Sequence, residues 1–128
     1  MVMVTEGSNV VAFDIVREYL RVNLHSNKVL GDACNLPFMN ETFTTVVATE
    51  ILEHLPHPHE AVREMRRVLK NNGRAIVSVP DRYNVFSQVE HIQYFNERKI
   101  LHLFKDFEAN VCKILPTGHI FCVFRVIK

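Results

Sequence analysis

Carboxylates that directly follow apolar runs are the residues of this sequence with the most evident chemistry. Asp14, Asp32 and Glu50 each stand just after a short run rich in Val, Leu or Ala. An ionised carboxylate offers two acceptor oxygens, so it can take hydrogen bonds from two donors of a ligand. An aspartate after a strand is also a common helix cap, and for Asp14, which precedes a helical pattern, both interpretations stand.

Histidines and a cysteine are further candidate groups. His54, His57 and His59 stand near Glu53, with prolines between them. The prolines stiffen the loop but produce no known metal-ligand spacing, so we expect no metal site. Cys34 has no recognisable activating partner, so we do not expect it to act as a nucleophile.

A cluster of basic side chains lies in the middle of the chain, at Arg63, Arg66, Arg67 and Lys70. Two glutamates interleave with them at helical spacing. That pattern is typical of a solvated helix face with salt bridges.

Length, composition and charge limit the function classes. The chain has 128 residues, and we expect a single domain over residues 1–128. It is 48% hydrophobic and 23% charged, which is globular usage and excludes a disordered chain. A formal net charge of +1 lacks the basic surplus of a nucleic-acid binder, so we expect no nucleic-acid partner.

The sequence also carries no sign of export or membrane insertion. No apolar run approaches the roughly 20 residues of a membrane span, and no secretory leader opens the chain. Three cysteines without a C-x-x-C pair argue against a disulfide framework or a zinc ribbon. We therefore expect a cytoplasmic protein with reduced thiols and no membrane partner.

Hydrophobic periodicity predicts alternating strands and helices. Pro58 suits a helix start, Asn71-Asn72-Gly73 tolerates the positive φ of a helix end, and Asn96 can cap a further helix. The predicted strands are 9–13, 29–30, 44–48, 75–79, 109–115 and 120–127, and the predicted helices are 15–24, 60–70 and the segment after Asn96.

Strands that alternate with helices predict an α/β fold. We expect a mostly parallel sheet with helices on both faces and an antiparallel hairpin at the C-terminal end. In such sheets ligands bind beyond the carboxyl ends of the strands. The loops after residues 13, 30, 48 and 79 are therefore the predicted site.

These loops carry motifs that resemble class I S-adenosylmethionine-dependent methyltransferases, and within them the type-11 group, which includes ubiquinone- and menaquinone-pathway enzymes. The resemblance covers roughly residues 9 to 128. It implies a Rossmann-like fold and S-adenosyl-L-methionine as cofactor. The matching motifs are Gly31-Asp32-Ala33-Cys34-Asn35-Leu36-Pro37-Phe38, Thr42-Phe43, Val46-Val47-Ala48-Thr49-Glu50-Ile51-Leu52-Glu53-His54-Leu55, Glu64-Met65-Arg66-Arg67-Val68-Leu69-Lys70-Asn71-Asn72-Gly73, Val79-Pro80, and His91 with Tyr94 and Phe95.

The resemblance implies roles for individual residues. Asp14 matches the acidic residue that binds both ribose hydroxyls, and Asp32 matches the residue that binds the adenine amino group. His91 is the candidate general base, although methyl transfer depends mainly on positioning and a base is optional. The implied cofactor-binding residues are Asp14, Ile15, Asp32, Ala33, Thr49, Glu50 and Ile51.

The first strand, the Gly-x-Gly-x-Gly loop and the first helix of the family have no counterpart here. Only residues 1–8 precede the counterpart of the second strand, with a single glycine, Gly7. The missing loop normally lets the backbone approach the amino-acid part of the cofactor, so its absence bears on whether the cofactor binds.

The missing strand would leave a gap of roughly 10 Å between the second and fourth strands of the family's sheet. Those two strands can close up, residues 1–4 of this chain or of a twin can fill the gap, or another polypeptide can supply the strand. Unpaired edges favour association, so we expect a homodimer or a larger assembly.

Three functions therefore stay open. The chain is a small-molecule methyltransferase, a catalytically silent relative that acts through oligomerisation, or one part of an enzyme whose glycine loop lies on a partner chain. Tyr83, Phe86, Tyr94 and Phe95 suggest an apolar wall for the acceptor, although aromatic residues packed in a core give the same pattern.

Overall fold

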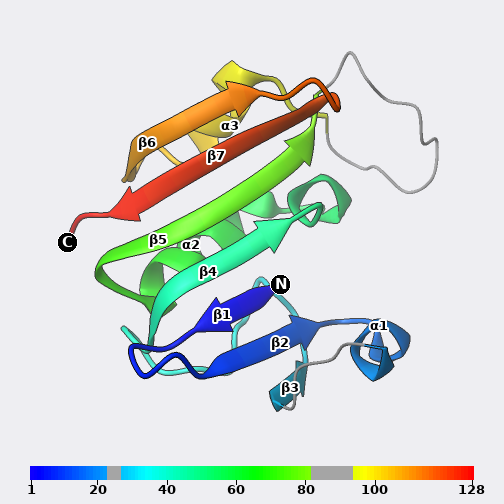
Figure 1. Ribbon diagram of the computed structural model, residues 1–128, viewed down its shortest axis with the longest axis vertical. Helices are drawn as coiled ribbons and strands as arrows, with labels where there is room; N and C mark the ends of the chain where they lie inside the picture. Colours follow the sequence, from blue (N-terminus) through cyan, green and yellow to red (C-terminus); the bar gives the residue numbers. More distant parts are fainter. Residues whose placement is uncertain (23–26, 82–93) are drawn as a thin grey trace.

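The computed structural model describes residues 1–22, 27–81 and 94–128, and the strands in these ranges form one mixed sheet. The strand order is β3-β2-β1-β4-β5-β7-β6 (Figure 1). Strands β2 to β6 point one way, and β1 and β7 point the other. This confirms the predicted α/β fold with its C-terminal antiparallel strands. The strands are β1 (Val2–Val4), β2 (Val10–Asp14), β3 (Asn27–Leu30), β4 (Phe43–Thr49), β5 (Leu69–Pro80), β6 (Phe107–Ile114) and β7 (His119–Val126).

Strand β1 fills the gap that the sequence left between β2 and β4. Met3 pairs with Val11 of β2 and with Val46 of β4, antiparallel to both, and its side chain is fully buried. The turn before β2 is held by a hydrogen bond from Ser8 N to Thr5 O of 3.0 Å. So short a turn joins antiparallel strands only, which is why β1 runs against the direction of its neighbours.

Helices cover both faces of the sheet, as predicted. Figure 1 shows α2 and α3 behind the sheet. The crossovers from β2 to β3 and from β4 to β5 move in opposite directions across the sheet, so right-handed connections place α1 on the face opposite α2. The helices are α1 (Arg17–Arg21), the 3-10 turn η1 (Leu52–His54), α2 (Pro58–Val68) and α3 (Glu97–Leu103).

The core lies between the sheet and helices α2 and α3. Every second residue of β7 is fully buried there, and the ring of Phe124 stacks on that of Phe104 with centroids 4.2 Å apart. The alternate side chains of the central strands, among them Val47 and Ile76, point to the other face and are only half-buried. The two faces of the sheet therefore differ in how well they are covered.

Element boundaries differ from the prediction around Gly73. Helix α2 ends at Val68, and β5 begins at once at Leu69 rather than at residue 75. Asn72 has a φ of +65°, as its type predicts. Gly73 is required by a close approach, because an added Cβ would lie 2.8 Å from the carbonyl oxygen of Lys70.

Two helix starts depend on a local hydrogen bond. The amide of Lys99 donates to Asn96 Oδ1 at 2.7 Å, which confirms Asn96 as the cap of α3. Helix α1 begins at Arg17 rather than at residue 15, because the amide of Val16, just before the helix, donates a hydrogen bond to Asp14 Oδ1.

Candidate functional site

Asp14 ends β2 and holds the loop that follows it. The amide of Val16 donates to Asp14 Oδ1 at 2.9 Å, a turn that delays the start of α1. Asp14 therefore stabilises a turn and does not cap the helix, because the N-cap residue of α1 is Val16 and has no side-chain cap hydrogen bond.

Asp32 lies beside Asp14, in the loop after the neighbouring parallel strand. The amide of Gly31 donates to the carbonyl oxygen of Asp14 at 2.9 Å, which joins the ends of β2 and β3. Asp32 also uses one carboxylate oxygen locally, accepting from the amide of Cys34 at 2.8 Å. The two aspartates therefore stand side by side, each fixed by a bond to its own loop.

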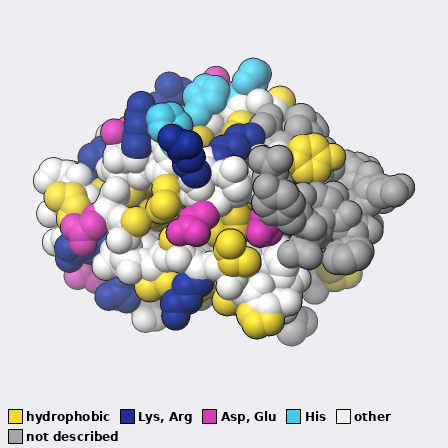
Figure 2. Space-filling model, turned by 90° about the horizontal axis from the view of Figure 1, so that it is seen from above, with side chains coloured by type: hydrophobic (Ala, Val, Ile, Leu, Met, Phe, Trp, Pro, Cys, Tyr) yellow, Lys and Arg dark blue, Asp and Glu magenta, His cyan; other side chains and the backbone are white. Residues whose placement is uncertain are grey.

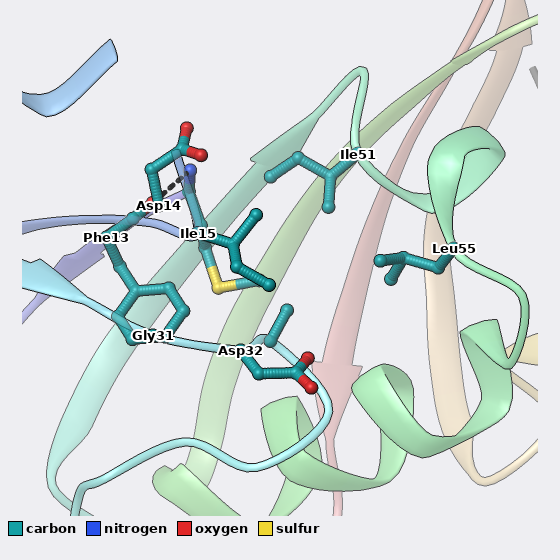
Figure 3. A pocket seen from close by; sticks show the side chains of 9 residues that line it. Phe13, Asp14, Ile15, Gly31, Asp32, Ile51 and Leu55 are labelled. Atoms are coloured by element: carbon teal, nitrogen blue, oxygen red, sulfur yellow. Dashed lines mark hydrogen bonds between the residues drawn. The ribbon is translucent and has the colours of Figure 1, made fainter. Parts of the chain in front are cut away.

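A hollow of about 80 Å³, open to solvent, lies between these aspartates and the loop after β4. That volume is well below the roughly 300–1,000 Å³ that is typical of small-molecule sites. Figure 3 shows Ile51 and Leu55 pointing across it toward Ile15 and Asp32. The hollow is lined by Met1, Phe13, Asp14, Ile15, Gly31, Asp32, Ala33, Ile51 and Leu55.

Gly31 is needed where β3 passes the ring of Phe13. A Cβ at this position would lie 2.9 Å from Phe13 Cζ and 3.0 Å from Cε2. The ring itself is 2% exposed and packs edge-on against Phe38, so it has little room to move. Glycine therefore lets the ring form the floor of the hollow.

The structure brings most of the predicted site residues together. Asp14, Ile15, Asp32, Ala33 and Ile51 line the hollow. Thr49 and Glu50 do not line it, and His91, Tyr83 and Phe86 lie outside the described residues.

Met1 is a lining residue that the sequence did not suggest. Its amino group donates to the carbonyl oxygen of Phe13 at 3.0 Å. Burial lowers the pKa of this amino group, and the nearby charge of Asp14 raises it in part. Met1 reaches the site because β1 is antiparallel, which brings its first residue to the edge where β2 and β4 end (Figure 1).

The loop that carries Asp32 is held by an ion pair on α2. Both carboxylate oxygens of Glu64 accept from the guanidinium of Arg67, at 2.7 and 2.8 Å, and the same group donates to the carbonyl oxygens of Leu36 and Phe38. Hydrogen bonding to Arg67 holds the pKa of Glu64 below its ordinary value. The sequence placed both residues on a solvated face; their real role is to clamp the loop at residues 36–38.

A second polar group adjoins the hollow at the end of β4. Glu53 is 1% exposed, and Glu50 accepts a hydrogen bond of 3.0 Å from Ser78 Oγ. Burial raises the pKa of Glu53 to about 8, and the charge of Glu50 adds to the effect. The position of Glu50 beside β5 explains why it does not line the hollow.

The remaining candidates carry less chemistry. Burial raises the pKa of the Cys34 thiol, and all three cysteines are free. Within the described ranges no group of three or more His, Cys, Asp or Glu side chains is arranged to hold a metal ion.

No described helix is long and apolar enough to cross a membrane. On the face in Figure 2, acidic and basic side chains are interspersed with apolar ones.

Comparison with protein families matches residues 1–77 to the model described as "Methyltransferase domain". Among curated proteins, the uncharacterized protein MJ0638 of Methanocaldococcus jannaschii is 31% identical over 128 residues. That alignment covers 97% of this chain and 55% of the relative, so the chain spans about half of the relative's length.

Solved structures share the fold. A chain of the Haloferax volcanii complex that contains the methyltransferase activator Trm112 matches with a TM-score of 0.81 at 15% identity, over 92% of this chain and 72% of that one. The 1,6-didemethyltoxoflavin-N1-methyltransferase of Burkholderia thailandensis, solved with 1,6-didemethyltoxoflavin and S-adenosylhomocysteine, matches with a TM-score of 0.74 at 17% identity, over 96% and 63%.

Proposed function

The chain belongs to the methyltransferase domain family, and from that premise we propose that it transfers the methyl group of S-adenosyl-L-methionine to a small-molecule acceptor. The observation that carries the proposal is the pair of aspartates at the hollow. Asp14 and Asp32 both line the hollow, and each is fixed by a backbone hydrogen bond to its Oδ1 atom.

The residues at the hollow fit a nucleoside. Carboxylates suit the hydroxyl and amino donors of a nucleoside, and the apolar walls formed by Phe13, Ile51 and Leu55 suit a flat base. In this assignment Asp14 binds the ribose hydroxyls and Asp32 the adenine amino group, with Ile15 and Ala33 beside them.

The protein's contribution to the reaction is mainly to hold the two reactants in line. When bound, the cofactor supplies a methyl group activated by a sulfonium. Ordered loops position the reacting atoms, which accounts for much of the rate in such a displacement. We assign Thr49, Glu50 and Ile51 to the methionine end, and we keep His91 as an optional base.

The alternative is a catalytically silent module. Met1 lines the hollow, and β1 occupies the place in the sheet between β2 and β4, which favours this second function. A partner chain that supplies the loop is the third possibility. One structural neighbour comes from a complex with a methyltransferase activator. We also retain the single domain, the homodimer and the cytoplasmic location as proposals.

Calorimetric titration with S-adenosylhomocysteine tests the proposal. The variant Asp14→Asn keeps an oxygen for the Val16 amide but removes the charge that faces the ligand. We expect it to weaken binding by roughly 10- to 100-fold, the loss typical of a hydrogen bond to a charged group.

Asp106→Ala, an exposed aspartate just before β6 at the far edge of the sheet, is the control and should bind like the wild type. Absence of wild-type binding at millimolar ligand would reject unaided methyl transfer and favour the silent module or a partner chain.

A further inference from the structure

Glu53 is a buried carboxylate that lies against a second carboxylate, Glu50. It is 1% exposed, and in the part of the chain that the structure describes neither of its carboxylate oxygens has a hydrogen-bond partner. The Nε2 atom of His54 lies 3.5 Å from its Oε1 atom. Buried carboxylates are normally hydrogen-bonded, paired with a cation or bound to a metal, so a group of this kind calls for an explanation.

A second carboxylate is held close to Glu53 by two neighbouring strands. Glu50 accepts from Ser78 Oγ of β5 at 3.0 Å, and His119 Nε2 of β7 lies 3.4 Å from its Oε1 atom. His119 is oriented in turn by Thr117 Oγ1, 3.0 Å from Nδ1. The backbone of Glu50 has a φ of +54°, an unfavourable conformation of the kind that clusters at ligand sites.

Positive charge around this pair of carboxylates comes from histidines alone. In the described residues, the ion pairs of Glu53 and Glu50 involve only His54 from η1 and His119 from β7. Burial and the neighbouring Glu50 raise the pKa of Glu53, so the pair holds a proton near neutral pH. A bound cation would replace that proton and satisfy both carboxylates.

We propose that Glu50, Glu53, His54 and His119 form a cation-binding site at the carboxyl end of β4, for an ammonium group of the methyl acceptor. The residue between the two glutamates, Ile51, lines the hollow, so the site adjoins the proposed cofactor position. That the ammonium group belongs to the methyl acceptor rests on the proposed function, whereas the cation site itself does not.

An ammonium group fits these side chains, whereas a metal ion does not. In the described residues no group of three or more His, Cys, Asp or Glu side chains is arranged to hold a metal ion. An ammonium group donates hydrogen bonds to the carboxylates where they stand. Its charge favours the ionised form of Glu53, so binding releases a proton.

The test is calorimetric titration of the whole chain at neutral pH, without S-adenosylhomocysteine, in two buffers of different ionisation enthalpy. The probes are propylammonium chloride in one arm and magnesium and manganese chloride in the other, against sodium chloride of equal ionic strength. We expect saturable binding with release of a proton, weakened at least tenfold in Glu53→Gln and unchanged in Glu18→Gln, an exposed glutamate on α1. Binding of propylammonium alone supports the proposal, and tighter binding of magnesium or manganese than of propylammonium would overturn it.

His119→Gln provides a second variant at a half-exposed position, where folding is less at risk. It should weaken the same binding. If propylammonium does not bind the wild type more tightly than Glu53→Gln and His119→Gln, the proposal is overturned. Because the nucleoside is absent, failure of S-adenosylhomocysteine binding would reject the proposed function and leave this result standing.

Discussion

At the scale of single residues, the hollow depends on side chains that hold the backbone of their own loops. Asp14 and Asp32 each give one oxygen to an amide two residues further along the chain. This local bond fixes the carboxylate without a second side chain. Side-chain identity and spacing are therefore visible in the sequence, whereas the hydrogen bond that fixes each carboxylate becomes visible only in the structure.

Gly31→Ala tests the tight packing at the floor of the hollow. The added Cβ would lie 2.9 Å from the buried Phe13 ring, so we expect the free energy of unfolding to fall by about 1–3 kcal/mol. Urea denaturation measures the effect. Gly7→Ala is the control, because its nearest neighbour outside the turn is a side-chain atom 3.5 Å away; equal losses in both variants would contradict the explanation.

Glu53 predicts a dependence of stability on pH. Its pKa in the folded protein is about 8, above the ordinary 4.5, so the protonated form is favoured by folding. The stability this provides is complete below pH 4.5 and is lost as the pH rises toward 8, by at most about 1.4 kcal/mol per pH unit.

Glu53→Gln should flatten the decline in the free energy of unfolding between pH 5 and 8. Urea denaturation across that range, with Glu18→Gln as the exposed control, checks this. Parallel pH profiles for the wild type and Glu53→Gln would show that Glu53 is ionised in the folded protein.

At the scale of elements, helix α2 positions the loop that carries Asp32. Arg67 is the connecting residue, since its guanidinium binds Glu64 of its own helix and two carbonyl oxygens of the loop. The geometry uses the planar fork of arginine, which lysine cannot reproduce.

Arg67→Lys should therefore lower the free energy of unfolding by about 1–3 kcal/mol at neutral pH. The folded pKa of Glu64 is lowered, so the stability it contributes is present above its unfolded pKa near 4.5 and is lost as the pH falls through the folded value. The difference between Arg67→Lys and the wild type should consequently shrink in acid.

Thermal and urea denaturation at neutral and acid pH measure both parts of this expectation. Arg63→Lys, an exposed arginine on the same helix, is the matched control. A difference that stays constant down to low pH would mean that Glu64 does not take part in the clamp.

At the scale of the whole molecule, strand β1 removes the gap from which we first inferred a dimer. Other features still favour association. Strands β3 and β6 are the edges of the sheet, and one of its faces presents half-buried apolar side chains that include Phe121 and Val123. Exposed apolar surface and unpaired edges are both common in interfaces between copies.

We expect light scattering after size exclusion to give twice the monomer mass. Val123→Lys, on that open face, should raise the dissociation constant, whereas Val22→Lys, at an exposed position at the end of α1, should leave it unchanged. A monomer at the highest attainable concentration would contradict the homodimer.

The sequence by itself determined the order of the strands and α-helices from residue 10 onward, three of the loops that line the hollow and the positions of Asp14 and Asp32. These features follow from the hydrophobic periodicity, the turn residues and the helix caps, which all depend on residues close together in the sequence. It also determined the positive φ of Asn72 and the cap at Asn96, for the same reason.

Only the tertiary structure decided the direction of β1, the clamp by Arg67 and the meeting of Glu50 with His119. Each joins segments distant in sequence or in the sheet, such as Glu50 after β4 and His119 at the start of β7. No local pattern encodes such a contact, because it exists only when strand pairing brings the two segments to the same edge of the sheet.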